Sequence, residues 1–120
     1  MTRSIDWVAR QAVMASMLYY GLAETTVSDG EFDEWCKRLA AEWDDLEPIR
    51  QWQLGSPAEI AASGFQIKVT TAAAEAAIRH LRSVRPGLPP VVMTRGDGWR
   101  WGEEHRVRYL NTYEFMFDPR

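Results

Sequence analysis

Residues 17–35 have the pattern of a helix end, a short polar turn and the start of a second helix, and this arrangement constrains the fold most. Ser28 and Glu31 have the spacing of a capping box, in which the Ser28 hydroxyl accepts from the Glu31 backbone N–H. Apolar residues then recur at helical spacing, which predicts one buried face. They are Phe32, Trp35, Cys36, Leu39, Ala40 and Trp43. The sequence therefore predicts a helical hairpin with helices at about 4–20 and 29–45.

The first helix of this hairpin carries an apolar stripe of its own. Its residues at helical spacing are Ile5, Val8, Ala12, Ala15 and Tyr19. Gly21 is expected to end the helix, because glycine adopts the left-handed conformation of a helix C-terminus without steric cost. We expect this stripe to pack antiparallel against the apolar face of the second helix.

The middle of the chain predicts further helices. Ser56 and Glu59 form a second capping box with a proline between them, and Ser63-Gly64 should end this short helix. Residues 65–69 alternate briefly and fit either a strand or a loop. The alanine-rich run from about Thr70 to Leu81 predicts a helix that ends before Pro86.

The C-terminal part has a different character. Val91–Met93 and Trp99–Trp101 predict two strands around a Gly96-Asp97-Gly98 turn, and residues 107–117 alternate in two further runs. We therefore expect a single α+β domain over residues 1–120. In it, residues 1–85 are mainly helical and residues 90–118 form a small antiparallel β-hairpin region.

Composition excludes several classes of protein. The chain has 120 residues and a formal charge of −3, so no global basic field attracts DNA or an anionic membrane. No run approaches the roughly 20 apolar residues of a membrane span. The single cysteine, Cys36, cannot form an internal disulfide, which favours a cytoplasmic protein. Neither histidine has the spacing of a zinc site, so no metal is expected.

Two tyrosines before the turn and two aspartates after it suggest a small binding site. Tyr19 and Tyr20 offer aromatic faces, and Asp29 and Asp33 offer carboxylates that share one face of the second helix. An aromatic face and a carboxylate are what a flat cation on a ribose requires. The alternative is a plain helical hairpin whose tyrosines are core and whose aspartates mark a helix start.

The same stretch resembles the N-terminal helical domain of bacterial NAD-dependent DNA ligases. The similarity runs without a gap from Leu18 to Trp35 and, with a small insertion, to Ser56-Pro57, so it covers roughly the first half of the chain. It implies that Tyr19, Tyr20, Asp29 and Asp33 take the positions that hold the nicotinamide mononucleotide half of NAD. Phe32 stands where that family usually has tyrosine, so one hydroxyl contact is missing.

A second similarity to the ligases lies at Thr94-Arg95-Gly96-Asp97-Gly98. In the family these residues form a hairpin turn of the nucleotidyltransferase domain, which implies that Arg95 helps to hold the nucleotide. The family's following Gly-Glu is displaced here to Gly102-Glu103, so Glu103 is not carried over. The alternative is a tight turn that simply uses its glycines.

The nucleophile of the ligases is absent. Those enzymes use the lysine of a Lys-x-Asp-Gly motif, and neither Lys37 nor Lys68 is followed by x-Asp-Gly. Arg95 does stand in an Arg-x-Asp-Gly sequence, but its guanidinium stays protonated and cannot act as the nucleophile. The resemblance therefore implies a non-catalytic module with no required cofactor, which weakly binds NAD or nicotinamide mononucleotide.

Two other function classes stay open. A protein-interaction module, such as a phage or mobile-element accessory factor or inhibitor, would use Trp99, Arg100 and Trp101, since tryptophan and arginine dominate binding hot spots. A single-stranded nucleic-acid binder is the third expectation and is not favoured, although arginines at 79, 82 and 85 make the second half locally basic.

Overall fold

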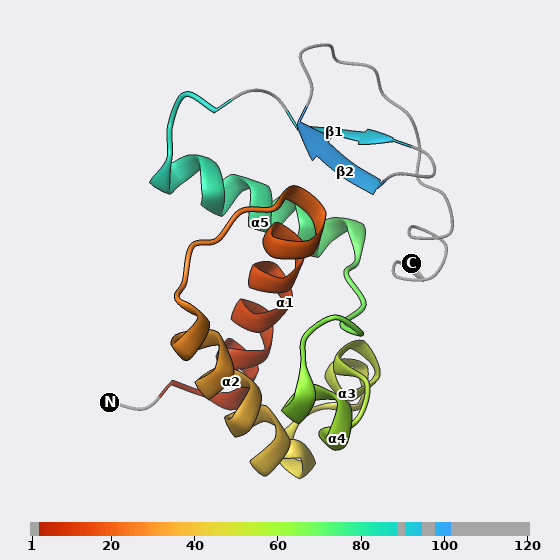
Figure 1. Cartoon of the computed structure of the whole chain (residues 1–120). Coiled ribbons are helices and arrows are strands. Elements are labelled where there is room, and N and C mark those ends of the chain that lie inside the picture. The colour runs from red at the N-terminus through yellow and green to blue at the C-terminus, as the bar shows by residue number, and fades with distance from the viewer. Residues whose placement is uncertain (1–2, 89–90, 95–97, 102–120) are drawn as a thin grey trace.

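The computed structural model describes residues 3–88, 91–94 and 98–101. Helices dominate this part of the chain, and α1 runs through its middle (Figure 1). The elements in chain order are α1 (Ile5–Leu22), α2 (Asp29–Ala41), the 3₁₀ turn η1 (Trp43–Asp45), α3 (Pro48–Leu54), α4 (Pro57–Ala62), α5 (Thr71–Val84), β1 (Val91–Thr94) and β2 (Gly98–Trp101).

Four of the helices begin at a hydroxyl cap. The side chains of Ser4, Ser28, Ser56 and Thr70 each accept from the backbone N–H three residues later. Such a cap contributes about 0.5–2 kcal/mol. The caps predicted at Ser28 and Ser56 are confirmed. Each cap joins residues only three apart, so it depends on the local sequence and needs no distant partner.

The end of α1 differs from the prediction. The helix continues through Gly21 to Leu22, and Ala23 takes the left-handed conformation with φ of 58°. The backbone N–H of Ala23 bonds to Tyr19, and that of Glu24 bonds to Leu18. Leu22 is only 5% exposed, so its burial holds the additional turn and offsets the roughly 1–2 kcal/mol that a left-handed alanine costs.

The core surrounds α1. In Figure 1, α5 crosses one end of α1, and α2 and α3 also pack against α1, while α4 packs against α2. Because α1 has neighbours on several sides, its buried residues extend beyond the predicted stripe: they are Val8, Ala9, Ala12, Val13, Ser16, Met17, Leu18 and Leu22. Tyr19, which we placed on that stripe, is 54% exposed.

The second helix ends earlier than predicted, but its apolar face is as expected. Leu39 is fully buried, and Trp35 and Trp43 pack against the core, Trp43 from the 3₁₀ turn. Trp35 meets Trp7 edge to face, with ring centroids 6.0 Å apart. The helical hairpin thus forms through aromatic and aliphatic contacts between α1 and α2.

The segment before α5 is a loop, which settles the ambiguity at residues 65–69. Ile67 and Val69 point into the core, while the Lys68 backbone N–H donates to the Gln53 carbonyl at 2.8 Å. The alanine-rich helix then forms as predicted and runs three residues further, to Val84.

The predicted fold class, α+β with a β-sheet, is wrong. The described residues are mostly helical, and no sheet layer covers the helices. β1 and β2 make only one two-stranded ladder, with Val91 opposite Trp101 and Thr94 opposite Gly98. Four-residue strands with one neighbour each bury too little to form a layer of a core, so the helices supply it. The alternating runs within 107–117 lie outside the described residues.

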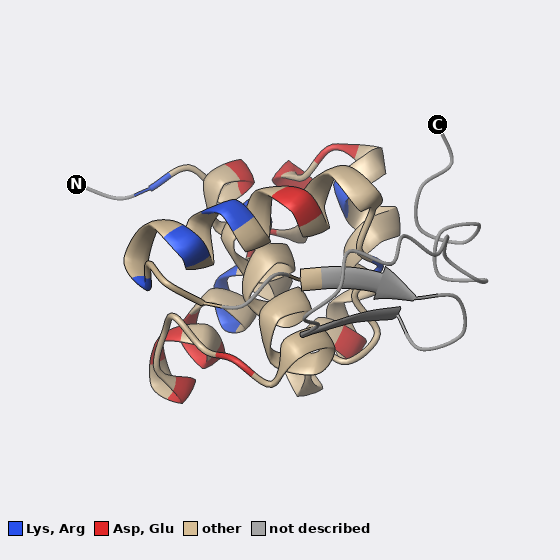
Figure 2. Cartoon of the chain, turned by 90° about the horizontal axis from the view of Figure 1, so that it is seen from above, with Lys and Arg blue, Asp and Glu red and all other residues tan. Residues whose placement is uncertain are grey.

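Charged residues of both signs occur on several helices (Figure 2). Among the described residues, no helix is both long and apolar enough to cross a membrane.

Candidate ligand pocket at the first interhelical turn

A pocket of about 340 Å³ lies where α1 ends and α2 begins. The last turns of α1, the loop at residues 25–28, the first turns of α2 and the end of α4 form its walls. We call it the turn pocket. Its lining residues are Ala15, Ser16, Tyr19, Tyr20, Thr25, Thr26, Val27, Ser28, Asp29, Phe32, Asp33, Ala62, Ser63 and Gly64.

The structure brings together the candidate residues from the helical half. Tyr19, Tyr20, Asp29, Phe32 and Asp33 all line the turn pocket. They come from two helices, and the α1–α2 reversal makes them neighbours.

The candidates from the C-terminal half cannot be added to this pocket. Arg95 lies outside the described residues, as does the turn that it belongs to. Trp99, Arg100 and Trp101 are in β2, where the structure describes their backbone pairing but not their side chains.

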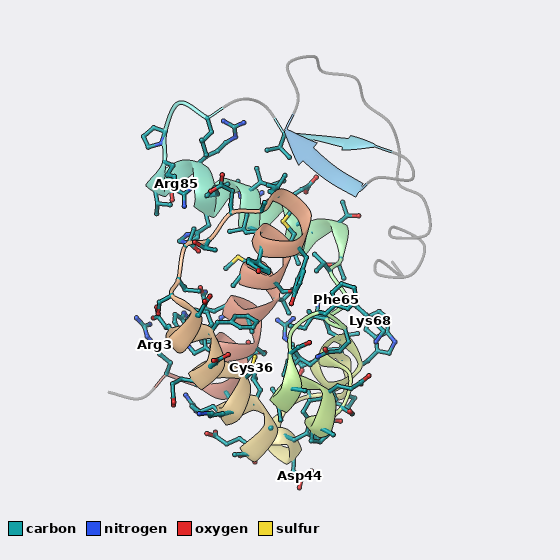
Figure 3. The ribbon with its side chains drawn as sticks, in the orientation of Figure 1. Arg3, Cys36, Asp44, Phe65, Lys68 and Arg85 are labelled. Atoms are coloured by element: carbon teal, nitrogen blue, oxygen red, sulfur yellow. The ribbon has the colours of Figure 1, made fainter. Side chains whose placement is uncertain are left out.

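Two aromatic rings, Tyr19 and Tyr20, line the turn pocket, and a third, Phe65, packs against Tyr20. Tyr19 and Tyr20 meet edge to face with centroids 4.9 Å apart, and Tyr20 meets Phe65 in the same way at 5.3 Å. All three rings are open to solvent, Phe65 most of all at 75% exposed (Figure 3). Partial burial of the Tyr20 hydroxyl, with smaller effects of Tyr19 and Cys36, raises the pKa of Tyr20 above its ordinary value.

The start of α2 contributes the two carboxylates of the turn pocket. Asp29 is the first residue of α2 and Asp33 lies one turn later, and both are exposed. The lining residues include no lysine or arginine in the part of the chain that is described. Asp33 also faces the buried Cys36 thiol, whose pKa rises to about 11 mainly through burial and further through that carboxylate. The turn pocket is therefore an acidic site.

A buried hydrogen bond fixes the floor of the turn pocket. The Ser16 hydroxyl, 4% exposed, donates to the Gly64 carbonyl at 3.2 Å and so ties α1 to the segment after α4. A Cβ on Gly64 would lie 2.7 Å from the Phe32 ring, so only glycine permits this approach. The sequence indicated Ser63-Gly64 merely as a helix stop, because no local pattern reveals a contact across 48 residues.

The loop that follows α1 in the turn pocket is held in place by a residue that directly follows α5. Arg85 pairs with the Glu24 carboxylate and donates to the Thr25 carbonyl. Figure 3 shows Arg85 at the end of α5, beside the α1–α2 connection. An arginine that the sequence assigned to a basic surface thus braces the pocket.

No protein-family model matches the chain, and neither a curated protein nor a solved structure matches it. Among the described residues, no cluster of three histidine, cysteine or acidic side chains has an arrangement suited to a metal ion.

Proposed function

We propose that this protein is a non-catalytic binding module related to the N-terminal domain of NAD-dependent DNA ligases, and that the turn pocket takes the nicotinamide side of nicotinamide mononucleotide or NAD. One observation carries the proposal: five residues chosen from the sequence alone, Tyr19, Tyr20, Asp29, Phe32 and Asp33, line a single pocket.

The chemistry of the turn pocket suits a flat cation on a sugar. Oxidised nicotinamide carries a positive charge that gains about 0.5–2 kcal/mol from an aromatic face. Asp29 and Asp33 offset that charge and accept hydrogen bonds from ribose hydroxyls. The volume of about 340 Å³ lies at the lower end of small-molecule sites, which suits one ring and its ribose.

The proposal excludes self-adenylation and places the protein in the cytoplasm. Lys37 pairs with Glu34 on α2, and Lys68 donates to the Trp52 carbonyl, so each lysine is engaged elsewhere than in the turn pocket. A buried, unpaired Cys36 supports a reducing compartment.

A titration with nicotinamide mononucleotide followed by amide chemical shifts tests the proposal. Residues 18–34 should shift selectively, with a Kd on the order of 0.1–1 mM, because a few exposed contacts supply only about 4–5.5 kcal/mol. Asp33→Asn should abolish the response. Asp44→Asn is the matched control, since Asp44 is an exposed acid at the opposite end of the molecule (Figure 3). A folded sample without shifts at about 5 mM ligand would refute ligand binding.

A protein-interaction module is the second candidate, and the exposed aromatic rings support it. Phe65 packs edge to face on Tyr20, which packs in the same way on Tyr19, and the three exposed rings form the kind of aromatic patch that partners cover. If a protein partner rather than a nucleotide is bound, Phe65→Ser should weaken its capture more than Asp33→Asn does.

Nucleic-acid binding is the least supported candidate. Two of the three arginines at the end of α5 serve the fold: Arg85 holds the pocket loop, and Arg82 donates to the Leu88 carbonyl at 3.1 Å. A side chain committed in this way contributes less to phosphate neutralisation than a solvated one.

A further inference from the structure

A second cleft, of about 730 Å³, lies between α1, α3 and the start of α5. It uses the first half of α1, whereas the turn pocket uses the second half. We call it the arginine cleft, after Arg10 and Arg50 in its lining. Nothing in the proposed function uses it.

The walls of the arginine cleft are largely apolar. Trp7 and Met14 line it from α1, and Ile49 and Trp52 line it from α3. Ile49 is 51% exposed and Trp52 is 37% exposed, so both keep apolar surface in water. A ligand that covers such surface gains about 25 cal/mol for each Å² of it removed from water.

The polar groups of the arginine cleft carry a positive balance. The Asp6 carboxylate bridges Arg50 at 3.0 Å and Arg10 at 3.3 Å, and Arg50 also donates to the Gln53 side chain at 3.0 Å. One carboxylate thus holds two guanidiniums in place and neutralises only one of them.

The start of α5 adds to this positive character. Thr70, Ala72 and Ala73 line the cleft, so the positive end of a 14-residue helix borders it. Beside them, the buried Thr71 hydroxyl has no hydrogen-bond partner within the described part of the chain. The two guanidiniums and this helix start belong to different elements and converge on one apolar cleft.

We propose that the arginine cleft binds an amphipathic anion, with an aromatic or aliphatic body on the tryptophan wall and one carboxylate or sulfonate at Arg10 and Arg50. A polyphosphate is disfavoured, because the surplus of charge is small and the walls are apolar. The preference is opposite to that of the acidic turn pocket, so one helix separates two sites of opposite charge.

A matched pair of fluorescent probes tests this proposal on the full chain. 1-Anilinonaphthalene-8-sulfonate and N-phenyl-1-naphthylamine share their aromatic body, and only the first carries a sulfonate. The folded protein should bind the sulfonate at one site and at least about tenfold more tightly than the neutral probe, since hydrogen bonds to charged groups contribute about 1.5–3 kcal/mol. Amide shifts should locate that site at residues 7–14, 49–53 and 70–76.

Substitutions at the bridge separate this proposal from a structural role of the ion pairs. Arg50→Gln should weaken sulfonate binding about tenfold and leave the neutral probe unchanged. Asp6→Asn removes the carboxylate that competes for the guanidiniums, so it should tighten sulfonate binding several-fold. A merely structural bridge would instead make both substitutions weaken it equally.

Three results would overturn the proposal. These are equal affinity for the two probes, an unchanged sulfonate affinity in Arg50→Gln, and amide shifts that map to the turn pocket. Asp44→Asn serves as the control, since Asp44 is an exposed acid that lines neither the arginine cleft nor the turn pocket.

Discussion

The buried bond from Ser16 to Gly64 offers a direct test of how the turn pocket is held. Ser16→Ala removes a donor that is 4% exposed and bonded at 3.2 Å. The Gly64 carbonyl keeps a second donor, the Ile67 backbone N–H at 3.2 Å, so it is not left unsatisfied. The expected loss is therefore that of one neutral hydrogen bond, about 0.5–1.5 kcal/mol, and not the larger cost of an orphaned carbonyl.

A second serine in a helix provides the control for this substitution. Ser83 bonds to the His80 carbonyl on the exposed face of α5, so Ser83→Ala removes a bond that water replaces. Alanine also favours helix over serine by a few tenths of a kcal/mol in both variants, and the comparison largely cancels that gain.

Thermal and urea unfolding of the two variants measure the difference. Ser16→Ala should be about 1 kcal/mol less stable than Ser83→Ala, which for a chain of this size lowers Tm by roughly 3–5 °C. Equal stability of the two variants would show that the Ser16 hydroxyl does not hold the floor of the turn pocket.

Two further predictions concern the same region. Gly64→Ala should lose about 1–3 kcal/mol because its Cβ would meet the Phe32 ring at 2.7 Å, whereas Gly30→Ala, with open space around it, should be neutral or stabilising in the same unfolding assay. Cys36 has its pKa raised from 9.0 to about 11, so the folded state prefers the neutral thiol and wild-type stability should fall between pH 9 and 11. Denaturant unfolding against pH should show this fall to be smaller in Cys36→Ala, and parallel curves would contradict the assigned burial.

The parts of the fold that the sequence predicted well are those that depend on neighbouring residues. Caps at Ser28 and Ser56 and the alanine-rich helix need only local chemistry. The end of α1 was misplaced because burial of Leu22 outweighs the preference of Gly21 for a helix end. The α+β fold class was predicted wrongly, because an alternating sequence pattern indicates that two strands can pair but not whether they form a sheet that packs on the helices.

The candidate sites follow the same division. The tyrosines and aspartates of the turn pocket lie within fifteen residues of one another, so a single stretch of sequence could suggest them. Their support from Gly64 depends on a contact across 48 residues. The arginine cleft depends on Asp6 meeting Arg50 across 44 residues, and no spacing in the sequence marks that pair.

The link from Arg85 to the loop after α1 has a consequence for the order of events during synthesis. Glu24 leaves the ribosome 61 residues before its partner, together with most of the side chains that line the turn pocket. A nascent chain that ends before α5 therefore has the tyrosines and aspartates but lacks the arginine that braces Thr25. The ribosome must therefore translate 60 residues beyond Thr25, as far as Arg85, before the pocket loop can be held in its final position.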